Sequence, residues 1–159
     1  MLTLSKLAFG VVLAAWQPST GLPNPSMTPG AINTHVTQSN IGTTICVRGW
    51  TRKVRPPEYY TEKLKRSQIR AYRYEDRRLG DYEEDHLIPL ELGGSPTSPQ
   101  NLWPEPHYVP GNLGSHSKDR LENRLHKLVC RGDLSLNNAR HAIASDWVAA
   151  YKRYMSSSY

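Results

Sequence analysis

Apolar residues recur at helical spacing along the C-terminal third of the chain. The first such segment starts at Ser117 and stops at Gly132, a residue type that commonly ends helices. The second starts at Ser135, which can cap a helix N-terminus, and carries a longer apolar face. The spacing therefore predicts two amphipathic helices whose apolar faces belong to the core. The expected core positions are Leu121, Leu125, Leu128, Val129, Leu136, Ala139, Ile143, Trp147, Ala150, Tyr151 and Tyr154.

Two shorter segments have the composition of β-strands. Residues 43–47 are rich in β-branched side chains, which favour extended structure. Residues 86–92 form an apolar run that enters a tight turn at Gly93-Gly94, and Pro89 confines this strand to a sheet edge or ends it early. Residues 95–105 predict a Pro-rich loop. Strands interspersed with helices indicate an α+β fold.

A basic helix is expected between these two strands. Pro56-Pro57 breaks the chain, and Thr61 can then cap a helix that runs to about Tyr74. Basic side chains surround its thin apolar stripe, so the helix either contacts phosphate groups or is a solvated surface helix, and the sequence leaves both open. The first interpretation assigns phosphate contacts to Lys65, Arg66 and Arg70.

The N-terminal residues predict an export signal. Lys6 precedes an apolar run over residues 7–16, which is too short to span a bilayer. We therefore expect a signal peptide over residues 1–19, a secreted or periplasmic location, and no stable membrane association once the signal is removed. A buried N-terminal helix is the alternative. Residues 20–33 are Pro-rich and predict a flexible arm, and residues 34–155 then form a single domain.

The net charge of +6 is unevenly distributed along the chain. Residues 48–80 contain eleven Lys or Arg and four Asp or Glu, whereas residues 81–105 contain six Asp or Glu and no Lys or Arg. This pattern suggests a polyanion-binding surface around a site that holds a cation. Solvated charged faces are the alternative for either run. With 21% charged and 38% hydrophobic residues, the composition is typical of a soluble globular protein and argues against a membrane or disordered one.

The two cysteines, Cys46 and Cys130, lie 84 positions apart. In an exported chain, an even count without CxxC or CxxH spacing favours one disulfide over a zinc site. Two free buried thiols are the alternative if the chain is not exported.

The acidic run contains a group with catalytic potential at Glu84-Asp85-His86. Ionised carboxylates beside a buried strand are costly unless they are paired or bound to a metal. Cutting a phosphodiester requires an activated nucleophile and a cation. A neutral imidazole at His86 can deprotonate water, while Asp85, pointing to the other side of the strand, can bind Mg²⁺ or a similar hard metal. A purely structural role is the alternative for His86.

The residues around this pair strengthen the catalytic interpretation. Asp85-His86 is followed by an apolar run and two glycines, Asn101 comes fifteen positions after His86, and a helix with acidic residues at 119 and 122 follows. This pattern resembles the HNH (ββα-metal) endonuclease family, and small exported HNH-like bacterial proteins in particular, over residues 28–154. Further shared blocks are Asn40-Ile41, residues 44–51, Val54 to Pro57 and Lys118 to Cys130.

The resemblance implies a ββα-metal core with additional helices. It assigns His86 as the general base and Asp85 as a metal ligand, and Asn101 would hold the imidazole in place through the loop backbone. The cysteine knuckles that brace many HNH domains are absent from this chain, so a Cys46–Cys130 bridge is expected to brace the fold instead.

The chain departs from the family pattern at its third position. Family members usually carry His or Asn about nine residues after the middle Asn, where this chain has Pro110. An acidic, amide or imidazole side chain near or in the following helix is therefore expected to complete the metal site. The candidates are Glu122 first, His116 next, and Asp119 and Asn123 after them.

The sequence therefore predicts a metal-dependent endonuclease that hydrolyses phosphodiester bonds in DNA with little sequence specificity, with RNA as a second substrate. The expected cofactor is a divalent ion, Mg²⁺ before Mn²⁺ or Zn²⁺. The alternatives are a catalytically inactive exported module of the same fold that binds nucleic acid or an acidic partner, and a small disulfide-stabilised protein without a metal. The oligomeric state is left open. The expected nucleic-acid contacts are Lys118, Arg55, Lys65, Arg66 and Arg70.

Overall fold

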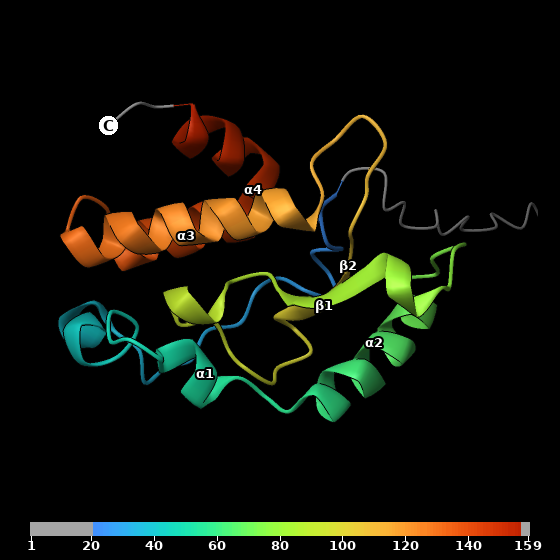
Figure 1. Cartoon of the computed structure of the whole chain (residues 1–159), viewed down its shortest axis with the longest axis horizontal. Coiled ribbons are helices and arrows are strands. Elements are labelled where there is room, and N and C mark those ends of the chain that lie inside the picture. Colours follow the sequence, from blue (N-terminus) through green and yellow to red (C-terminus); the bar gives the residue numbers. More distant parts are fainter. Residues whose placement is uncertain (1–20, 157–159) are drawn as a thin grey trace, which may run out of the picture.

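Two long helices, α3 (Ser115–Arg131) and α4 (Leu136–Met155), pack against each other and contribute much of the hydrophobic core. The computed structural model describes residues 21–156. Figure 1 shows α4 passing behind α3 and turning away from it toward its C-terminal end. The backbone of α4 leaves helical geometry at Asp146, where φ is −164°.

The boundaries expected for α3 and for the start of α4 agree with the structure to within two residues. Ser135 caps α4, and its side chain accepts a hydrogen bond from the Asn138 N–H at 3.2 Å. Gly132 ends α3 with a φ of 82°, a left-handed conformation that glycine adopts without steric cost. The expected core positions on both helices are buried, apart from Tyr151 and Tyr154, which are partly exposed.

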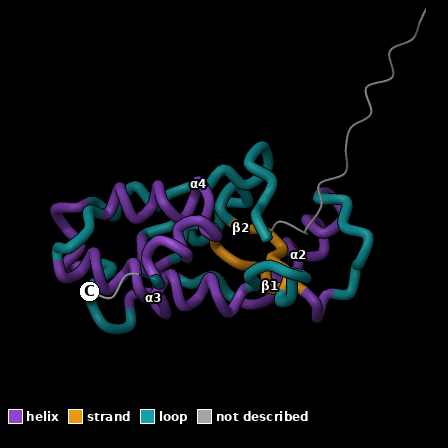
Figure 2. Tube along the Cα trace, turned by 90° about the horizontal axis from the view of Figure 1, so that it is seen from above, coloured by secondary structure: helices purple, strands orange, loops and turns teal. Residues whose placement is uncertain are grey.

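The sheet has two antiparallel strands, β1 (Tyr82–His86) and β2 (Leu102–Pro106). In Figure 1, β1 passes between α2 (Glu58–Ala71) and α3. The view from above shows both strands beside α2, with the paired C-terminal helices extending away from them (Figure 2). The mixed helix and sheet class is therefore confirmed, and the sheet lies between a basic helix and the helical core.

The strand expected over residues 86–92 is wrong, because the strand found here lies before His86 and not after it. β1 ends at His86, where the prediction began, and the apolar run forms a buried turn with a 3₁₀ helix, η4 (Leu90–Leu92). The run is apolar because this turn is folded into the core: Leu87 and Leu92 are almost fully buried. Pro89 lacks the N–H that a central strand position would donate.

The strand expected over residues 43–47 is also wrong. A 3₁₀ helix, η2 (Gln38–Thr43), is followed there by turns. The hydroxyl groups of Thr43 and Thr44 both donate to the Asn40 carbonyl, at 3.1 and 2.8 Å. Such local bonds give the backbone an alternative to a strand ladder.

The basic helix begins four residues earlier than predicted. α2 starts directly after Pro57, and the Thr61 hydroxyl donates to the Glu58 carbonyl inside the first turn, so it does not act as the cap. A short helix, α1 (Trp50–Val54), precedes it, and a 3₁₀ turn, η3 (Leu79–Asp81), leads into β1.

The Pro-rich segment after residue 20 packs against the domain, in contrast to the flexible arm that its composition suggests. Thr28 is fully buried, and its hydroxyl lies 2.6 Å from the Tyr72 hydroxyl. The Trp147 indole N–H donates to the Gly21 carbonyl at 2.7 Å. The predicted signal peptide lies outside the described residues. Within residues 21–156, no helix combines the length and apolar character needed to cross a membrane.

Candidate functional site

Side chains along β1 alternate between the two faces of the sheet, and this separates its acidic residues. Asp85 faces α3, where its Oδ2 lies 2.5 Å from the Lys118 ammonium. Glu84 belongs to the α2 face, within electrostatic reach of Lys65. His86 closes the strand and is 3% exposed.

Asn101 stabilises the loop that follows β1 through side-chain hydrogen bonds. Its side-chain oxygen accepts the Ile88 N–H at 2.9 Å, and its amide nitrogen donates to the carbonyls of Ile88 and Ser95 at 2.9 and 3.0 Å. Gly94 is required here, because a Cβ at that position would lie 1.7 Å from the Ile88 carbonyl oxygen. The fully buried Asn101 therefore joins both ends of this loop through three hydrogen bonds.

The same loop holds the imidazole of His86. His86 Nε2 lies 3.0 Å from the Pro96 carbonyl oxygen, which can only accept a hydrogen bond. Nε2 therefore carries the hydrogen, and Nδ1 has the lone pair. Burial lowers the pKa of His86 below its usual value, although the Asp85 carboxylate acts in the opposite direction. The ring is accordingly neutral at neutral pH, with Nδ1 as its basic atom.

An ammonium group sits between the carboxyl groups of the α3 face. Lys118 Nζ donates to Asp85 Oδ2 at 2.5 Å, to the His86 carbonyl at 2.8 Å and to Glu122 Oε1. Its side chain has no exposed surface. Three acceptors match the three hydrogens of an ammonium group, so the hydrogen-bonding capacity of Lys118 is saturated.

The charges around Lys118 nearly cancel at neutral pH. Burial alone would lower the pKa of Lys118, but its carboxyl neighbours raise it well above the usual value. Burial would raise the pKa of Asp85, yet Lys118 brings it below its ordinary range. Burial raises the pKa of Glu122 to about 8 and that of Glu105 well above its usual value. The cluster therefore holds one ammonium, one carboxylate and two carboxyls that largely keep their protons.

This arrangement does not fit a divalent metal between Asp85 and Glu122. The two carboxyl oxygens converge on one point, as ligands of a hard cation do, but the ammonium of Lys118 fills that point. A metal there would displace a fully buried, fully bonded cation. His116, the next candidate ligand, has a side chain that is 90% exposed, and its nearest carboxylate is Asp119 at 3.9 Å.

Two of the lysines expected to contact nucleic acid are enclosed by the protein. Besides the buried Lys118, Lys65 of α2 donates to the Tyr82 carbonyl at 3.2 Å and pairs with Glu62 at 2.7 Å. Lysine in a sequence usually indicates surface charge, but here the two ammonium groups compensate buried acceptors on either face of β1. They are therefore structural lysines and not phosphate contacts.

The three arginines among the predicted nucleic-acid contacts are exposed. Arg55 lies just after α1, is exposed, and is within electrostatic reach of His86 and Asp119. Arg66 and Arg70 of α2 line a separate hollow together with Arg77. Arg55 therefore lies near enough to the candidate site to act on it electrostatically, and the three other arginines line one separate hollow.

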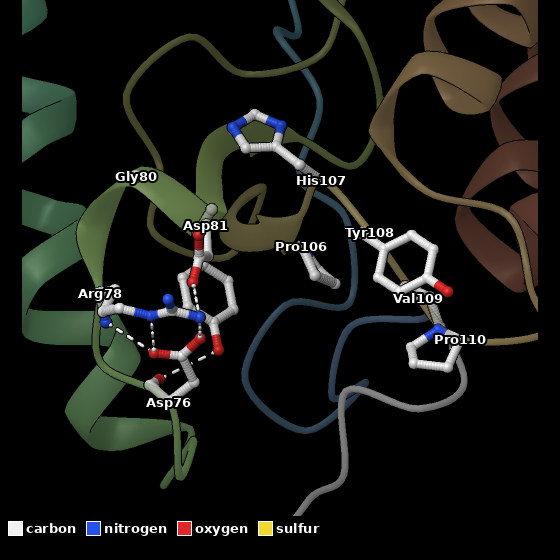
Figure 3. Close-up of a pocket in the computed structure, with 10 residues that line it drawn as sticks. Asp76, Arg78, Gly80, Asp81, Pro106, His107, Tyr108, Val109 and Pro110 are labelled. Carbon is white, nitrogen blue, oxygen red and sulfur yellow. Dashed lines mark hydrogen bonds and ion pairs between the residues drawn. The ribbon is translucent and has the colours of Figure 1, made fainter.

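A hollow of about 420 Å³ lies at the opposite end of β1 from His86. Figure 3 shows the ion-paired side chains of Asp76, Arg78 and Asp81 on one side of it, with Tyr108 on the other. Arg78 is bonded to both carboxylates, at 3.1 and 2.5 Å, so its single positive charge is shared between them. The hollow lies beside the Tyr82 end of β1, whereas Asp85 and His86 are at the other end of the strand.

The predicted disulfide between Cys46 and Cys130 is present, with a Cα–Cα distance of 5.7 Å. His126 stands beside it. The ligand atoms of these three residues lie within 4.8 Å of one another, and this is the one group of three or more His, Cys, Asp or Glu within residues 21–156 that is tight enough to hold a metal ion.

Sequence reasoning missed Glu105 and His126. Glu105 was missed because residues 95–105 were expected to be a loop. In the structure, β2 pairs with β1 so that Glu105 and Trp103 share a face with Asp85. The signal for His126 was present, because a histidine four positions before a cysteine in a helix lies on the same side.

Comparison of the chain with protein-family models, curated proteins and solved structures finds no match.

Proposed function

We propose that this protein is an endonuclease that hydrolyses phosphodiester bonds in nucleic acid, with His86 as the general base. The observation that carries the proposal is the Nε2–H bond from His86 to the Pro96 carbonyl, on a loop fastened by Asn101. It places the hydrogen on Nε2, and burial lowers the pKa of His86, so the neutral ring has its lone pair on Nδ1, which is the state that a base for water activation requires. The succession of β1, the Asn101-bound loop, β2 and α3 supports an HNH-like core.

In the proposed reaction, His86 Nδ1 takes a proton from a water molecule. The resulting hydroxide attacks phosphorus, the bond from phosphorus to the leaving oxygen breaks, and that oxygen takes up a proton from solvent. Lys118 does not touch the phosphate because it is fully buried. Its charge keeps Asp85 ionised, and Asp85 in turn favours the imidazolium that His86 forms.

Nucleic acid would bind through exposed arginines. Arg55 is the exposed cation within electrostatic reach of His86, and Arg66 and Arg70 extend the basic surface along α2. Guanidinium groups pair with phosphate oxygens without reading bases, so binding is expected to be nonspecific and to weaken with salt. DNA is the first expected substrate, and RNA the second.

The disulfide supports the expectation that the mature chain works in an oxidising compartment. We therefore include export, with removal of the first 19 residues, in the proposal. Assays should use the disulfide-bonded mature protein.

The direct experiment incubates supercoiled plasmid, and separately a labelled RNA, with purified protein. His86→Ala should lower nicking by about 10²-fold or more, because a general base typically contributes 10²–10⁴-fold. The matched control is His141→Ala, which removes an exposed histidine of α4 and should leave the rate unchanged. Equal rates for His86→Ala and the unmodified protein would contradict the proposal.

A second candidate is a binding module without hydrolytic activity. It is favoured by Lys118, whose ammonium fills the position where the family resemblance implies a metal. This candidate predicts salt-dependent binding of plasmid by the unmodified protein with no nicking in Mg²⁺, Mn²⁺ or chelator. The same plasmid experiment therefore decides between the two.

A further inference from the structure

The disulfide joins two segments that are distant in sequence, and a histidine faces it. Cys46 lies in the turns after η2, while Cys130 and His126 lie one helical turn apart near the end of α3. His126 Nε2 is 3.3 Å from Cys130 Sγ. The group is at the opposite end of α3 from Lys118 and shares no residue with the candidate nuclease site.

The second nitrogen of His126 faces a carboxylate. His126 Nδ1 lies 3.8 Å from Glu91 Oε2, and Glu91 comes from η4. A histidine that binds a metal through one ring nitrogen commonly has the N–H of the other held by a carboxylate or carbonyl. In the disulfide form, Nε2 is 2.9 Å from the Ile45 carbonyl, so its hydrogen points there. A shift of that hydrogen to Nδ1 would free Nε2 and direct the N–H toward Glu91.

We propose that reduction of the disulfide creates a zinc site formed by Cys46, Cys130 and His126, with Glu91 orienting the imidazole. Two thiolates and one imidazole are ligands that Zn²⁺ prefers. The three ligand atoms already lie within 4.8 Å of one another. Sulfur and nitrogen ligands at about 2.0–2.3 Å from a tetrahedral ion are about 3.5–3.8 Å apart, so the two sulfur atoms move apart to that distance once their bond is broken. The fourth position is filled by water.

The chemistry balances with a dithiol as reductant. The dithiol transfers two electrons and two protons, the Cys46–Cys130 bond breaks to give two thiols, and the dithiol closes to a cyclic disulfide. Binding of Zn²⁺ then releases the two thiol protons. All three side chains are partly exposed, so the reductant and the ion reach them without unfolding.

The two cysteines could then link the same two segments in either of two mutually exclusive ways, through a disulfide or through a metal ion. Under oxidising conditions a covalent bond ties the segment around Cys46 to the end of α3, and in the thiol form a metal ion ties the same segments together. The fold would therefore be braced both before and after oxidation of the chain.

The test uses Co²⁺ as a spectroscopic substitute for Zn²⁺. The mature protein is reduced with a dithiol, desalted without oxygen and titrated with Co²⁺. We expect one Co²⁺ per reduced chain, with a sulfur-to-cobalt charge-transfer band that Zn²⁺ abolishes, and no such band for the disulfide form. Co²⁺ bound at carboxylates such as Asp85 gives no sulfur band, so this readout is independent of the nuclease proposal.

Variants test which side chains hold and orient the ion. His126→Ala should weaken Co²⁺ binding by at least tenfold, and Glu91→Gln by about tenfold, as for other groups that orient a ligand. His141→Ala is the control and should bind as the unmodified chain does. The proposal is overturned if the reduced chain gives no sulfur band, whether folded or unfolded by circular dichroism, or if His126→Ala binds Co²⁺ with unchanged affinity.

Discussion

The ammonium of Lys118 lies 2.5 Å from the Asp85 carboxylate, in a position without solvent exposure. Removing one partner of a buried ion pair leaves the other charge uncompensated, which is more damaging than losing a surface pair. Lys118 is thus both a stabilising element of the fold and the occupant of the point where carboxyl groups from β1 and α3 converge.

Lys118→Ala should therefore lower the free energy of unfolding by about 3–5 kcal/mol. It should also create a metal site, because Asp85 and Glu122 lose their cation and a space opens between them. We expect Mg²⁺ to raise the melting temperature of Lys118→Ala and to leave that of the unmodified protein unchanged.

The control for this experiment is Lys127→Ala, which removes an exposed lysine from the same helix. Its stability should stay within about 0.5 kcal/mol of the unmodified protein, with no response to Mg²⁺. A magnesium-dependent rise in the melting temperature of the unmodified protein would contradict the conclusion that Lys118 excludes the ion.

Asn101→Ala should destabilise the loop after β1. Three hydrogen bonds are lost, and the Ile88 N–H and the Ile88 and Ser95 carbonyls lose their side-chain partner. At about 1 kcal/mol per bond we expect a loss of about 3 kcal/mol, measured by urea unfolding. Asn123→Ala, on an exposed part of α3, is the matched control and should change little.

Glu84 makes stability depend on pH. Burial, followed by the nearby Asp85 charge, raises the pKa of Glu84 to about 9. The folded chain therefore keeps a proton that the unfolded chain releases above its ordinary pKa of about 4.3, so stability falls as the pH rises from about 4.3 to about 9. Glu84→Gln cannot ionise and should be more stable than the unmodified protein at pH 7 by about 1–3 kcal/mol.

The comparison is made by urea unfolding at several pH values. The gap between Glu84→Gln and the unmodified protein should widen from pH 5 to pH 8. Glu75→Gln, at an exposed position, should show no such gap. A constant difference across this pH range would mean that Glu84 is ionised in the folded state.

Arg55 and Lys65 should behave differently in nucleic-acid binding, although the sequence suggests the same role for both. Arg55 is exposed, so Arg55→Ala should weaken DNA binding and reduce the slope of log affinity against log salt by about 1. Lys65 is bonded to the Tyr82 carbonyl, so Lys65→Ala should lower stability and leave the salt slope unchanged. Fluorescence anisotropy at several salt concentrations measures both slopes.

The periodicity of apolar residues was sufficient to predict α3 and α4, because a helix that buries one face must repeat that face every three to four residues. The Cys46–Cys130 pair was likewise predictable from residue type and count. The strands were not. The run after His86 is apolar because it forms a buried turn. A short run of this kind has no periodicity that distinguishes a strand from a turn.

The sequence by itself determined which residues belong to the core helices, the position of the Asp85-His86 pair beside an apolar run, and the spacing to Asn101. Only the tertiary structure decided which charged side chains are buried and which are exposed. Lys118 and Lys65 look like surface lysines in the sequence, but strand pairing and helix packing place their ammonium groups against buried oxygens. The energy of a charge depends on its solvent exposure and its neighbours across the fold, and neither is a local property of the chain.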